Sequence, residues 1–244
     1  MNYSDLTFKD RNPVKRYLQR QRLKEVAKKL TQTLDNQSHL HILDFGCGNA
    51  ELYKYLKESF PSFSYIGYDP SEKYIEEARY NVQLTANDAL TFDKNEILDK
   101  KYDLIFSLEV FEHLPDDVMS HELDTLQTLL SSHGILVVAV PNELYLVALI
   151  RGLFRMTRRF GAYDATPKNV LRSTIGLPPT DRHKTLNKAG NYIWAHMGFD
   201  YRVLGKTLQN YFQVSAPFGS PFPLLPLLFN TEVNIFCRPK KQRS

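Results

Sequence analysis

The stretch that decides the fold reads HILDFGCGNA and spans residues 41–50. Its apolar residues are typical of a strand buried on both faces. Gly46 and Gly48 then break the apolar run, because residues without a Cβ tolerate positive φ and let the backbone approach a ligand. Residues 52–60 repeat apolar side chains at helical spacing until Pro61. The pattern predicts a strand, a glycine turn and a helix whose first N–H groups face the same space as the turn.

An acidic residue follows the next predicted strand at a distance typical of nucleoside sites. That strand covers residues 64–68, and Asp69 comes directly after it, 25 residues beyond Asp44. A carboxylate at this position can accept hydrogen bonds from the two ribose hydroxyls of an adenosine. The alternative is a surface turn in which Asp69, Pro70 and Ser71 only begin the helix predicted at residues 72–79.

Composition sets broad limits on the protein class. A chain of 244 residues is long enough for one α/β domain, or for one domain with an insertion. The formal net charge of +4 permits an anionic partner without requiring one. Two cysteines, Cys47 and Cys237, form no disulfide framework, which favours a reducing compartment. The polar N-terminus and the absence of an apolar run of about 18 residues predict a cytoplasmic protein without signal peptide or membrane span.

Residues 9–30 are rich in Lys and Arg, with leucines and other apolar residues at helical spacing. We interpret them as an amphipathic helix on the edge of the domain with a solvated basic face. The alternative is a docking face for nucleic acid or lipid headgroups.

Two carboxylates and an imidazole follow the strand predicted at residues 102–108. Glu109, Glu112 and His113 lie within five residues of one another, at the end of a central strand, where open α/β sheets bind ligands. His113 could act as a general base near neutral pH, or could hold a divalent metal with the two glutamates. Alternatively, Glu112 and His113 only organise the turn into the next helix. We assign catalysis to His113 and Glu112 and no residue to a metal.

Between these motifs, residues 83–85 predict a weak strand that is followed by Asn87, Asp88 and Ala89. Asp88 could accept a hydrogen bond from an adenine amino group, or could form an ordinary Asx turn. Gly134 leads into the most apolar strand, ILVVAV at residues 135–140. Strands and helices thus alternate five times, which predicts a doubly wound α/β fold with a parallel sheet and right-handed crossovers.

In this order the motifs resemble those of the class I S-adenosylmethionine-dependent methyltransferases, over roughly residues 40–142. The resemblance implies a Rossmann-like, mostly parallel, seven-stranded sheet with its last strand antiparallel, and S-adenosyl-L-methionine as the cofactor. It also implies that the methionine part lies over the glycine turn, the ribose at Asp69 and the adenine at Asp88. The cofactor-binding residues that it implies are Asp44, Gly46, Cys47, Gly48, Asp69, Asp88, Ala89, Leu108 and Glu109.

Departures from related patterns narrow this interpretation. The family's third turn glycine is Ala50 here, which is small enough to be tolerated. No Asn-Pro-Pro-Tyr-type motif follows the fourth strand, which argues against amino methylation of DNA bases. A nicotinamide-binding turn needs a small third residue at position 51, where this chain has Glu51, and a carboxylate there would repel a pyrophosphate.

The second half of the chain is less regular. Residues 144–160 are apolar, with Arg151, Arg155, Arg158 and Arg159 on one helical face. This helix could lie on an anionic membrane, could form a lid whose arginines receive an acidic substrate, or could simply pack with a solvated face. Residues 161–192 read as a long insertion of the kind that often forms a functional lid. His183 and His196 are further base candidates, although a structural role explains each one taken alone.

Residues 194–211 predict the last helix, and residues 212–217 and 232–238 predict a closing β-hairpin. Between these strands, the apolar residues 222–229 could contact a partner, a membrane or a lipid chain, or could pack on the sheet. We therefore divide the chain into a basic helical segment (1–36), a cofactor-binding half (37–143), an insertion or lid (144–192) and a C-terminal part (193–244) that completes the same domain.

The segment Glu109-x-x-Glu112-His113 resembles that of ubiquinone-pathway O-methyltransferases, and that of RNA 3′-end ribose methyltransferases that use a metal. The apolar and basic second half favours a small-molecule, saccharide or lipid-linked hydroxyl as the acceptor, with peripheral membrane contact through residues 144–160. Nucleic acid is not the expected partner. His113 would remove the hydroxyl proton while the protein aligns the acceptor. The alternatives are a metal-dependent RNA ribose methyltransferase and a non-catalytic member that only binds the cofactor.

Overall fold

The computed structural model describes residues 13–31 and 39–240. Within these ranges the strands form one eight-stranded sheet in the order β3-β2-β1-β4-β5-β8-β6, with the short β7 paired to β8. The first five strands run parallel to one another, and β8 lies antiparallel to β5. The predicted α/β class, with a mostly parallel sheet and an antiparallel last strand, is confirmed.

The first half of the chain alternates strands and helices, as the sequence predicts. Its elements are α2 (Pro13–Thr31), β1 (Leu40–Phe45), α3 (Glu51–Ser59), β2 (Phe63–Tyr68), α4 (Glu72–Asn81), β3 (Ala89–Thr91), α5 (Asn95–Leu98), β4 (Tyr102–Leu108), η1 (Phe111–His113), α6 (Asp116–Leu129) and β5 (Leu130–Pro141). The predicted boundary at residues 36 and 37, and the basic residues Lys9 and Arg11, lie outside the described residues.

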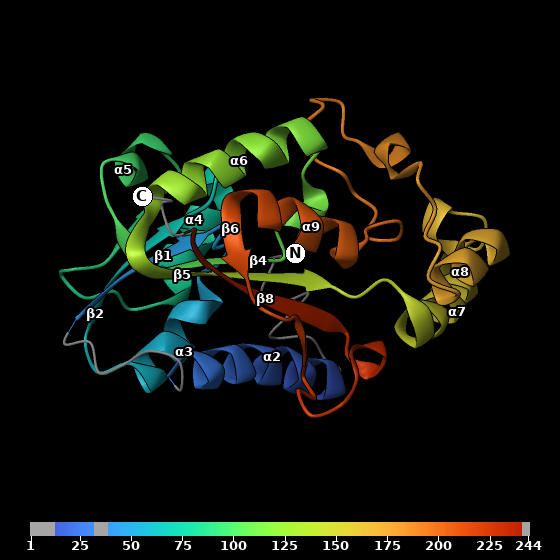
Figure 1. Cartoon of the computed structure of the whole chain (residues 1–244), viewed down its shortest axis with the longest axis horizontal. Helices are drawn as coiled ribbons and strands as arrows, with labels where there is room; N and C mark the ends of the chain where they lie inside the picture. Colours follow the sequence, from blue (N-terminus) through green and yellow to red (C-terminus); the bar gives the residue numbers. More distant parts are fainter. Residues whose placement is uncertain (1–12, 32–38, 241–244) are drawn as a thin grey trace.

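The second half holds more irregular chain. Its elements are α7 (Tyr145–Arg159), η2 (Tyr163–Ala165), α8 (Pro167–Thr174), η3 (Arg182–Thr185), α9 (Tyr201–Tyr211), β6 (Phe212–Val214), β7 (Phe218–Ser220), η4 (Leu227–Phe229) and β8 (Glu232–Pro239). Figure 1 shows α6 and α9 on one side of the sheet and α2 and α3 on the other, while α7 and α8 lie together at one end of the long dimension.

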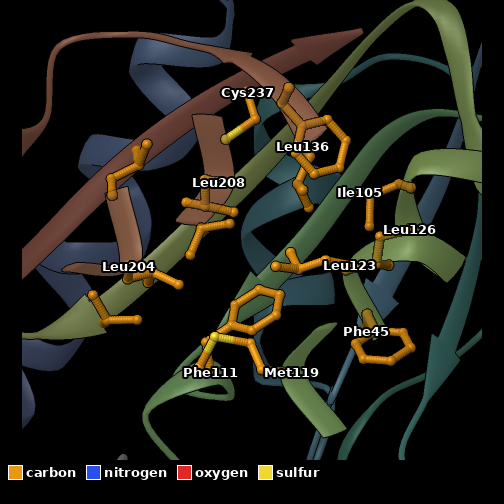
Figure 2. Packing of buried hydrophobic residues seen from close by; sticks show 14 of the residues in the cluster. Phe45, Ile105, Phe111, Met119, Leu123, Leu126, Leu136, Leu204, Leu208 and Cys237 are labelled. Atoms are coloured by element: carbon orange, nitrogen blue, oxygen red, sulfur yellow. The ribbon is translucent and has the colours of Figure 1, made fainter. Parts of the chain in front are cut away.

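The central strands are buried on both faces because neighbouring residues join different cores. In β1, Ile42 packs with the α2, α3 and α4 side chains, whereas Leu43 packs with those of α5, α6 and α9. In β4, Leu104 and Ile105 divide in the same way. Figure 2 shows the second of these cores, where α6 and α9 residues meet the sheet. The sheet is therefore the middle layer of three, and its carboxyl edge is free to carry a site.

Three predicted elements differ from the structure. The strand predicted at residues 83–85 is wrong, because the third strand is Ala89–Thr91. The helix predicted from residue 194 begins only at Tyr201, where the Asp200 side chain accepts a hydrogen bond from the N–H of Arg202. The sheet gains an eighth strand, since β7 lies inside the loop predicted between the last two strands and pairs with β8.

Both cysteines are free and buried.

No helix in the described part of the chain combines the length and apolarity that crossing a bilayer would require.

The core shown in Figure 2 gives a first prediction. Leu126 on α6 is fully buried, so Leu126→Ala should lower the free energy of unfolding by about 2–5 kcal/mol through lost burial and a residual cavity. The matched change Leu171→Ala, at an exposed position on α8, should stay within about 0.5 kcal/mol. Urea unfolding of the three proteins measures both values. Equal losses in the two variants would contradict the assigned core.

Candidate functional site

The turn after β1 is built so that only small residues fit. The N–H groups of Gly46 and Cys47 both donate to the carbonyl oxygen of Tyr68, at 2.8 and 2.9 Å, which ties the turn to the end of β2. Gly46 has a φ of 81°, and a Cβ there would lie 2.4 Å from Cγ2 of Val110. Gly48 also has positive φ, at 52°. The backbone is therefore open toward the space above the sheet edge, as predicted.

A cavity of about 80 Å³ lies over this turn. Its walls include six of the predicted cofactor residues, namely Asp44, Gly46, Cys47, Gly48, Leu108 and Glu109. Asn49 also lines it, and the buried Nδ2 of Asn49 has no hydrogen-bond partner within the described residues. Glu109 has a φ of 59°, a strained conformation for a residue with a Cβ, of the kind that persists at functional sites. A backbone cradle and an unused donor fit a polar ligand at this position.

Two carboxyl groups at this edge of the sheet are poorly solvated. Burial raises the pKa of Asp44 to about 7, although the Tyr65 hydroxyl donates to its Oδ2 at 2.9 Å. Burial also raises the pKa of Asp69, which accepts hydrogen bonds from the N–H groups of Gly48 and Ser71 at 3.0 and 2.9 Å. The Asp69 carboxylate thus touches the glycine turn, where the sequence places the ribose-binding carboxylate.

Three charged residues in the wall of the cavity form an ion-pair network that the sequence analysis did not predict. Nη2 of Arg22, on α2, donates hydrogen bonds to Oε1 of Glu109 and to Oε1 of Glu232. Burial lowers the pKa of Arg22, but the two carboxylates outweigh burial and raise it, so the guanidinium stays charged. These partners are 87 and 210 residues away in the sequence, and no local pattern indicates such a contact.

The structure does not place Asp88 and Ala89 with the other cofactor residues, and we correct this assignment. Asp88 precedes β3, and its carboxylate accepts hydrogen bonds from the Tyr53 hydroxyl, the Tyr65 N–H and Thr85. Burial opposes its charge, but these bonds outweigh burial and lower its pKa. Asp88 therefore lies at the amino end of the parallel strands, opposite the glycine turn. There its carboxylate stabilises the turn before β3 through the bonds with Thr85.

The carboxyl end of β3 instead brings Phe92 and Asp93 toward Asp69. The N–H of Asp69 donates to the carbonyl oxygen of Thr91, the last residue of β3, at 3.2 Å. The error follows from the misplaced third strand. The sequence placed this strand at residues 83–85, so Asp88 was expected after it, whereas Asp88 precedes the strand at Ala89–Thr91.

A second cluster gathers around His113, beside the cavity. Its Nδ1 lies 2.8 Å from the carbonyl oxygen of Ile193 and must donate to it, which leaves the lone pair on Nε2. The Tyr192 ring stacks on the imidazole with a centroid distance of 4.4 Å, and the His196 ring meets it edge-on at 4.8 Å. The sequence indicated His196 only as a further base candidate and did not indicate Tyr192. His183 is exposed and outside this cluster.

Burial shifts the pKa of each ionisable member of this cluster toward its uncharged form. Burial raises the pKa of Glu112 well above its usual value, and both of its oxygens lack a hydrogen-bond partner in the described chain. Burial lowers the pKa of His113. Burial, helped by His113, lowers the pKa of His196 to about 3. The contact of 3.8 Å between Nε2 of His113 and Oε1 of Glu112 therefore joins two groups whose charged forms burial disfavours.

Glu112, His113 and His196 also have the geometry of a cation site. One ligand atom from each lies within 4.8 Å of the others. Neutral imidazoles and a carboxylate without other partners are common ligands for divalent transition metals. The arrangement can therefore act either as a proton acceptor, through Nε2 of His113, or as three ligands of a metal.

Tyr192 lies near carboxyl groups of both the cavity and this cluster. Burial raises the pKa of Tyr192 to about 12, and the charges of Glu112, Asp69 and Glu109 contribute. Its side chain is therefore within electrostatic reach of both the predicted ribose carboxylate and the predicted catalytic pair. The loop before α9, which carries Tyr192, Ile193 and His196, thus contributes directly to the cluster.

The arginines of α7 are not arranged as the sequence pattern indicated. Arg151 and Arg155 donate to the buried carboxylate of Glu143 at 2.7 and 2.8 Å. Burial opposes the charge of Glu143, but the two guanidinium groups outweigh burial and lower its pKa to about 2. Arg159 pairs with Asp164, which Arg155 also approaches. Three of the four arginines are thus paired with acidic side chains, although Arg159 stays exposed.

Comparison with known families agrees with this geometry. The family model described as "Methyltransferase domain" matches residues 18–174. The match covers the glycine turn, Asp69 and the Glu109–His113 segment, and reaches through α8.

Solved structures are similar to the chain over most of its length. Magnesium protoporphyrin IX methyltransferase from Synechocystis PCC 6803 with bound SAH is 15% identical over 95% of this chain and 89% of that chain, with a TM-score of 0.58. The methyltransferase domain of bacterial CtHen1 is 15% identical over 91% and 99%, with a TM-score of 0.56. The plantazolicin methyltransferase BpumL, in complex with a monoazolic desmethylPZN analog and SAH, is 15% identical over 91% and 83%, with a TM-score of 0.55. At these identities the similarity shows a shared fold.

The lowered pKa of His196 predicts a pH dependence of stability. Between pH 6.5 and about 3, the unfolded chain binds a proton on this imidazole and the folded chain does not, so folding stability falls as the pH falls through this window. Urea unfolding at pH 7 and pH 5 should therefore show a larger loss for the native protein than for His196→Asn. His121→Asn, at an exposed position on α6, is the matched control. Equal losses for native protein and His196→Asn would contradict the inferred charge state.

Proposed function

Because the chain belongs to the class I S-adenosylmethionine-dependent methyltransferases, we propose that it methylates a hydroxyl oxygen of a small-molecule, saccharide or lipid-linked acceptor. The observation that carries this proposal is the neutral His113, whose Nδ1 is bonded to Ile193 and whose Nε2 is left as a proton acceptor. An imidazole of lowered pKa suits a hydroxyl nucleophile, which must lose a proton as it attacks.

The cavity offers partners for each part of S-adenosylmethionine. The turn at Gly46 and Gly48 would lie under the methionine part, and the Arg22 guanidinium would receive its carboxylate. Glu109 or Glu232, both bonded to Arg22, would take its ammonium group. Asp69 would accept the ribose hydroxyls.

Phe92 and Asp93, which follow β3, replace Asp88 and Ala89 in our proposal as the adenine neighbours. A cavity of about 80 Å³ is smaller than typical ligand sites of ~300–1,000 Å³. Arg22 and Leu23 form part of its wall, so α2 would move outward as the cofactor enters and Arg22 exchanges a carboxylate partner for the ligand.

The acceptor would lie between the cavity and the His113 cluster. The bound cofactor supplies a methyl group already activated by a positively charged sulfur, so the protein's main task is alignment, which can contribute about 7–11 kcal/mol. Tyr192 would cover the acceptor, because its ring stacks on His113 and because Asp69 and Glu109 lie near enough to raise the pKa of its hydroxyl. Burial raises the pKa of Glu112, and its carboxyl, which has no other hydrogen-bond partner in the described chain, would orient the acceptor beside His113.

The named acceptors of similar proteins differ widely. A magnesium protoporphyrin enzyme and a plantazolicin enzyme share this fold with the chain. The choice of a hydroxyl acceptor therefore depends on the charge state of His113 and not on these similarities.

The proposed carboxylate contact predicts a ligand-dependent effect of Arg22→Gln. Loss of a charged hydrogen bond of about 1.5–3 kcal/mol should weaken binding of S-adenosylhomocysteine by ~10–100-fold. Binding of 5′-methylthioadenosine, which lacks the amino-acid part, should change little. Asp69→Ala should weaken both ligands, because both carry the ribose. Calorimetric titration measures these affinities.

Lys24→Gln, at an exposed position of the same helix, is the matched control and should bind both ligands as the native protein does. If Arg22→Gln weakened the two ligands equally, Arg22 would shape the cavity without contacting the carboxylate.

The proposed base predicts a pH profile. Because burial lowers the pKa of His113 below 6.5, kcat/KM should fall only on an acidic limb below pH 6.5, where the imidazole gains a proton. His113→Gln should lower kcat by about 10²–10⁴-fold and remove this limb. S-adenosylhomocysteine binding should survive, and His133→Gln, at an exposed position on β5, should match the native profile. A His113→Gln variant with native kcat would contradict the role.

A second candidate function is metal-dependent methylation of a ribose hydroxyl in RNA. It is favoured by the convergence of Glu112, His113 and His196 within 4.8 Å. A divalent ion there would supply a Lewis acid for the acceptor oxygen, and it would give the unpartnered carboxyl of Glu112 a partner.

The assay that tests His113 separates the two candidates. Under the second, dialysis against a chelator removes activity, Mn²⁺ or Mg²⁺ restores it, and His196→Asn abolishes the restoration. Under the first, chelation leaves the acidic limb and the rate unchanged.

A further inference from the structure

The helix α7 divides sharply into an inner and an outer face. The inner face is buried by α8 and the body of the domain through Val147, Ala148 and Gly152. A Cβ at Gly152 would lie 2.5 Å from Cγ2 of Val170, so the α7 backbone packs directly against an α8 side chain. With the Glu143 partners Arg151 and Arg155 also turned inward, the inner face is fully occupied.

The outer face of α7 carries large apolar side chains with no cover. Ile150 is 60% exposed, Leu153 51% and Phe154 62%, and their spacing of three and four residues places them on one stripe. Phe160, just after the helix, is 73% exposed. Leu171, on the neighbouring α8, and Ile175, directly after that helix, are also exposed. We call the six residues Ile150, Leu153, Phe154, Phe160, Leu171 and Ile175 the outer apolar surface.

The segment that carries this surface is strongly basic. Residues 145–177 contain six basic side chains and one acidic side chain, Asp164, and that acid is already paired with Arg155 and Arg159. Arg158, Lys168 and Arg172 are exposed and form no salt bridge with a described residue. The Arg158 guanidinium lies 5.5 Å from the ring centre of Phe154. Cations thus border the apolar stripe directly.

We propose that the outer apolar surface docks on an anionic lipid bilayer, with α7 lying in the plane of the headgroups. Apolar side chains on one stripe, bordered by cations, are the pattern of helices that bind at a bilayer interface, because the apolar groups enter the acyl boundary and the cations meet anionic headgroups. A basic rim suits a lipid surface better than a neutral protein groove. Arg158 can extend along Phe154 and keep its charge at the headgroup level.

Docking in this way would bring the methyl-transfer site close to the membrane. The charges of Glu143, Arg151 and Arg155, at the base of α7, act on His196 of the catalytic cluster. The same helix therefore faces the site on its inner side and the bilayer on its outer side. Figure 1 shows that α7 and α8 occupy one end of the molecule, away from α2 and α3, so a flat membrane can reach them. The docking does not depend on which acceptor is methylated.

Cosedimentation of the full chain with vesicles tests the proposal. The native protein should bind vesicles of phosphatidylcholine with about 30% phosphatidylglycerol at least ~10-fold better than pure phosphatidylcholine vesicles, since each exposed cation adds attraction to anionic lipid. The double variant Ile150→Ser, Phe154→Ser should lose about tenfold or more on the anionic vesicles. The double variant Lys168→Glu, Arg172→Glu should lose the preference for anionic lipid.

Tyr80→Ser is the matched control, because Tyr80 is an exposed aromatic side chain on α4 and should not affect docking. Retained S-adenosylhomocysteine binding shows that each variant is folded, and it is measured separately from docking. No binding of the native chain to either vesicle would overturn the proposal. So would a native dimer in analytical ultracentrifugation that the Ile150→Ser, Phe154→Ser variant dissociates, because the surface would then join two copies of the chain.

Discussion

Parallel pairing of β1 with both β2 and β4 forces these three strands to end at the same edge of the sheet. Each strand then delivers one part of the site: the glycine turn follows β1, Asp69 follows β2, and Glu109 follows β4. The N–H groups of Gly46 and Cys47 bond the end of β2, and the N–H of Glu109 bonds the carbonyl oxygen of Ala139 in β5. Because backbone bonds fix these positions, the chemistry of the site depends on the registry of the sheet more than on any one side chain.

The charge around this edge favours a cationic ligand. Asp69, Glu109 and Glu232 are carboxyl groups at or near the cavity, and Arg22 pairs with Glu109 and Glu232. Such a field repels phosphates and attracts an ammonium or a sulfonium group. The sequence alone supported the same exclusion through Glu51, which also lines the cavity. S-adenosylmethionine carries both kinds of cation, so the electrostatics of the chain agree with its family.

Local patterns predicted those parts of the site that neighbouring residues build. The glycine turn, Asp69 and the His113 segment each follow a strand that apolar residues define, and the structure brings all three to one edge. Asp88 was misplaced because β3 has only three residues, too few to give a periodic pattern. Arg22, Glu232 and Tyr192 could not be found at all, because their contacts join residues that are 79 or more positions apart. Only packing in three dimensions decides such contacts.

The helix α7 shows what amphipathic spacing can and cannot decide. The spacing groups the four arginines on one helical face, but it does not say which of them turn inward. Arg151 and Arg155 do, whereas Arg158 is exposed beside Phe154. The usual assumption buries the apolar side. Here the buried carboxylate of Glu143 draws arginines inward beside Val147 and Ala148, because an unpaired charge in the interior is far more costly than apolar side chains left in water. Arg151 and Arg155 must therefore turn inward, and the apolar stripe is left outside as a consequence. The outer apolar surface is thus a consequence of the internal ion pairs of Glu143. Docking on a bilayer would remove the free-energy cost of exposing these apolar side chains to water.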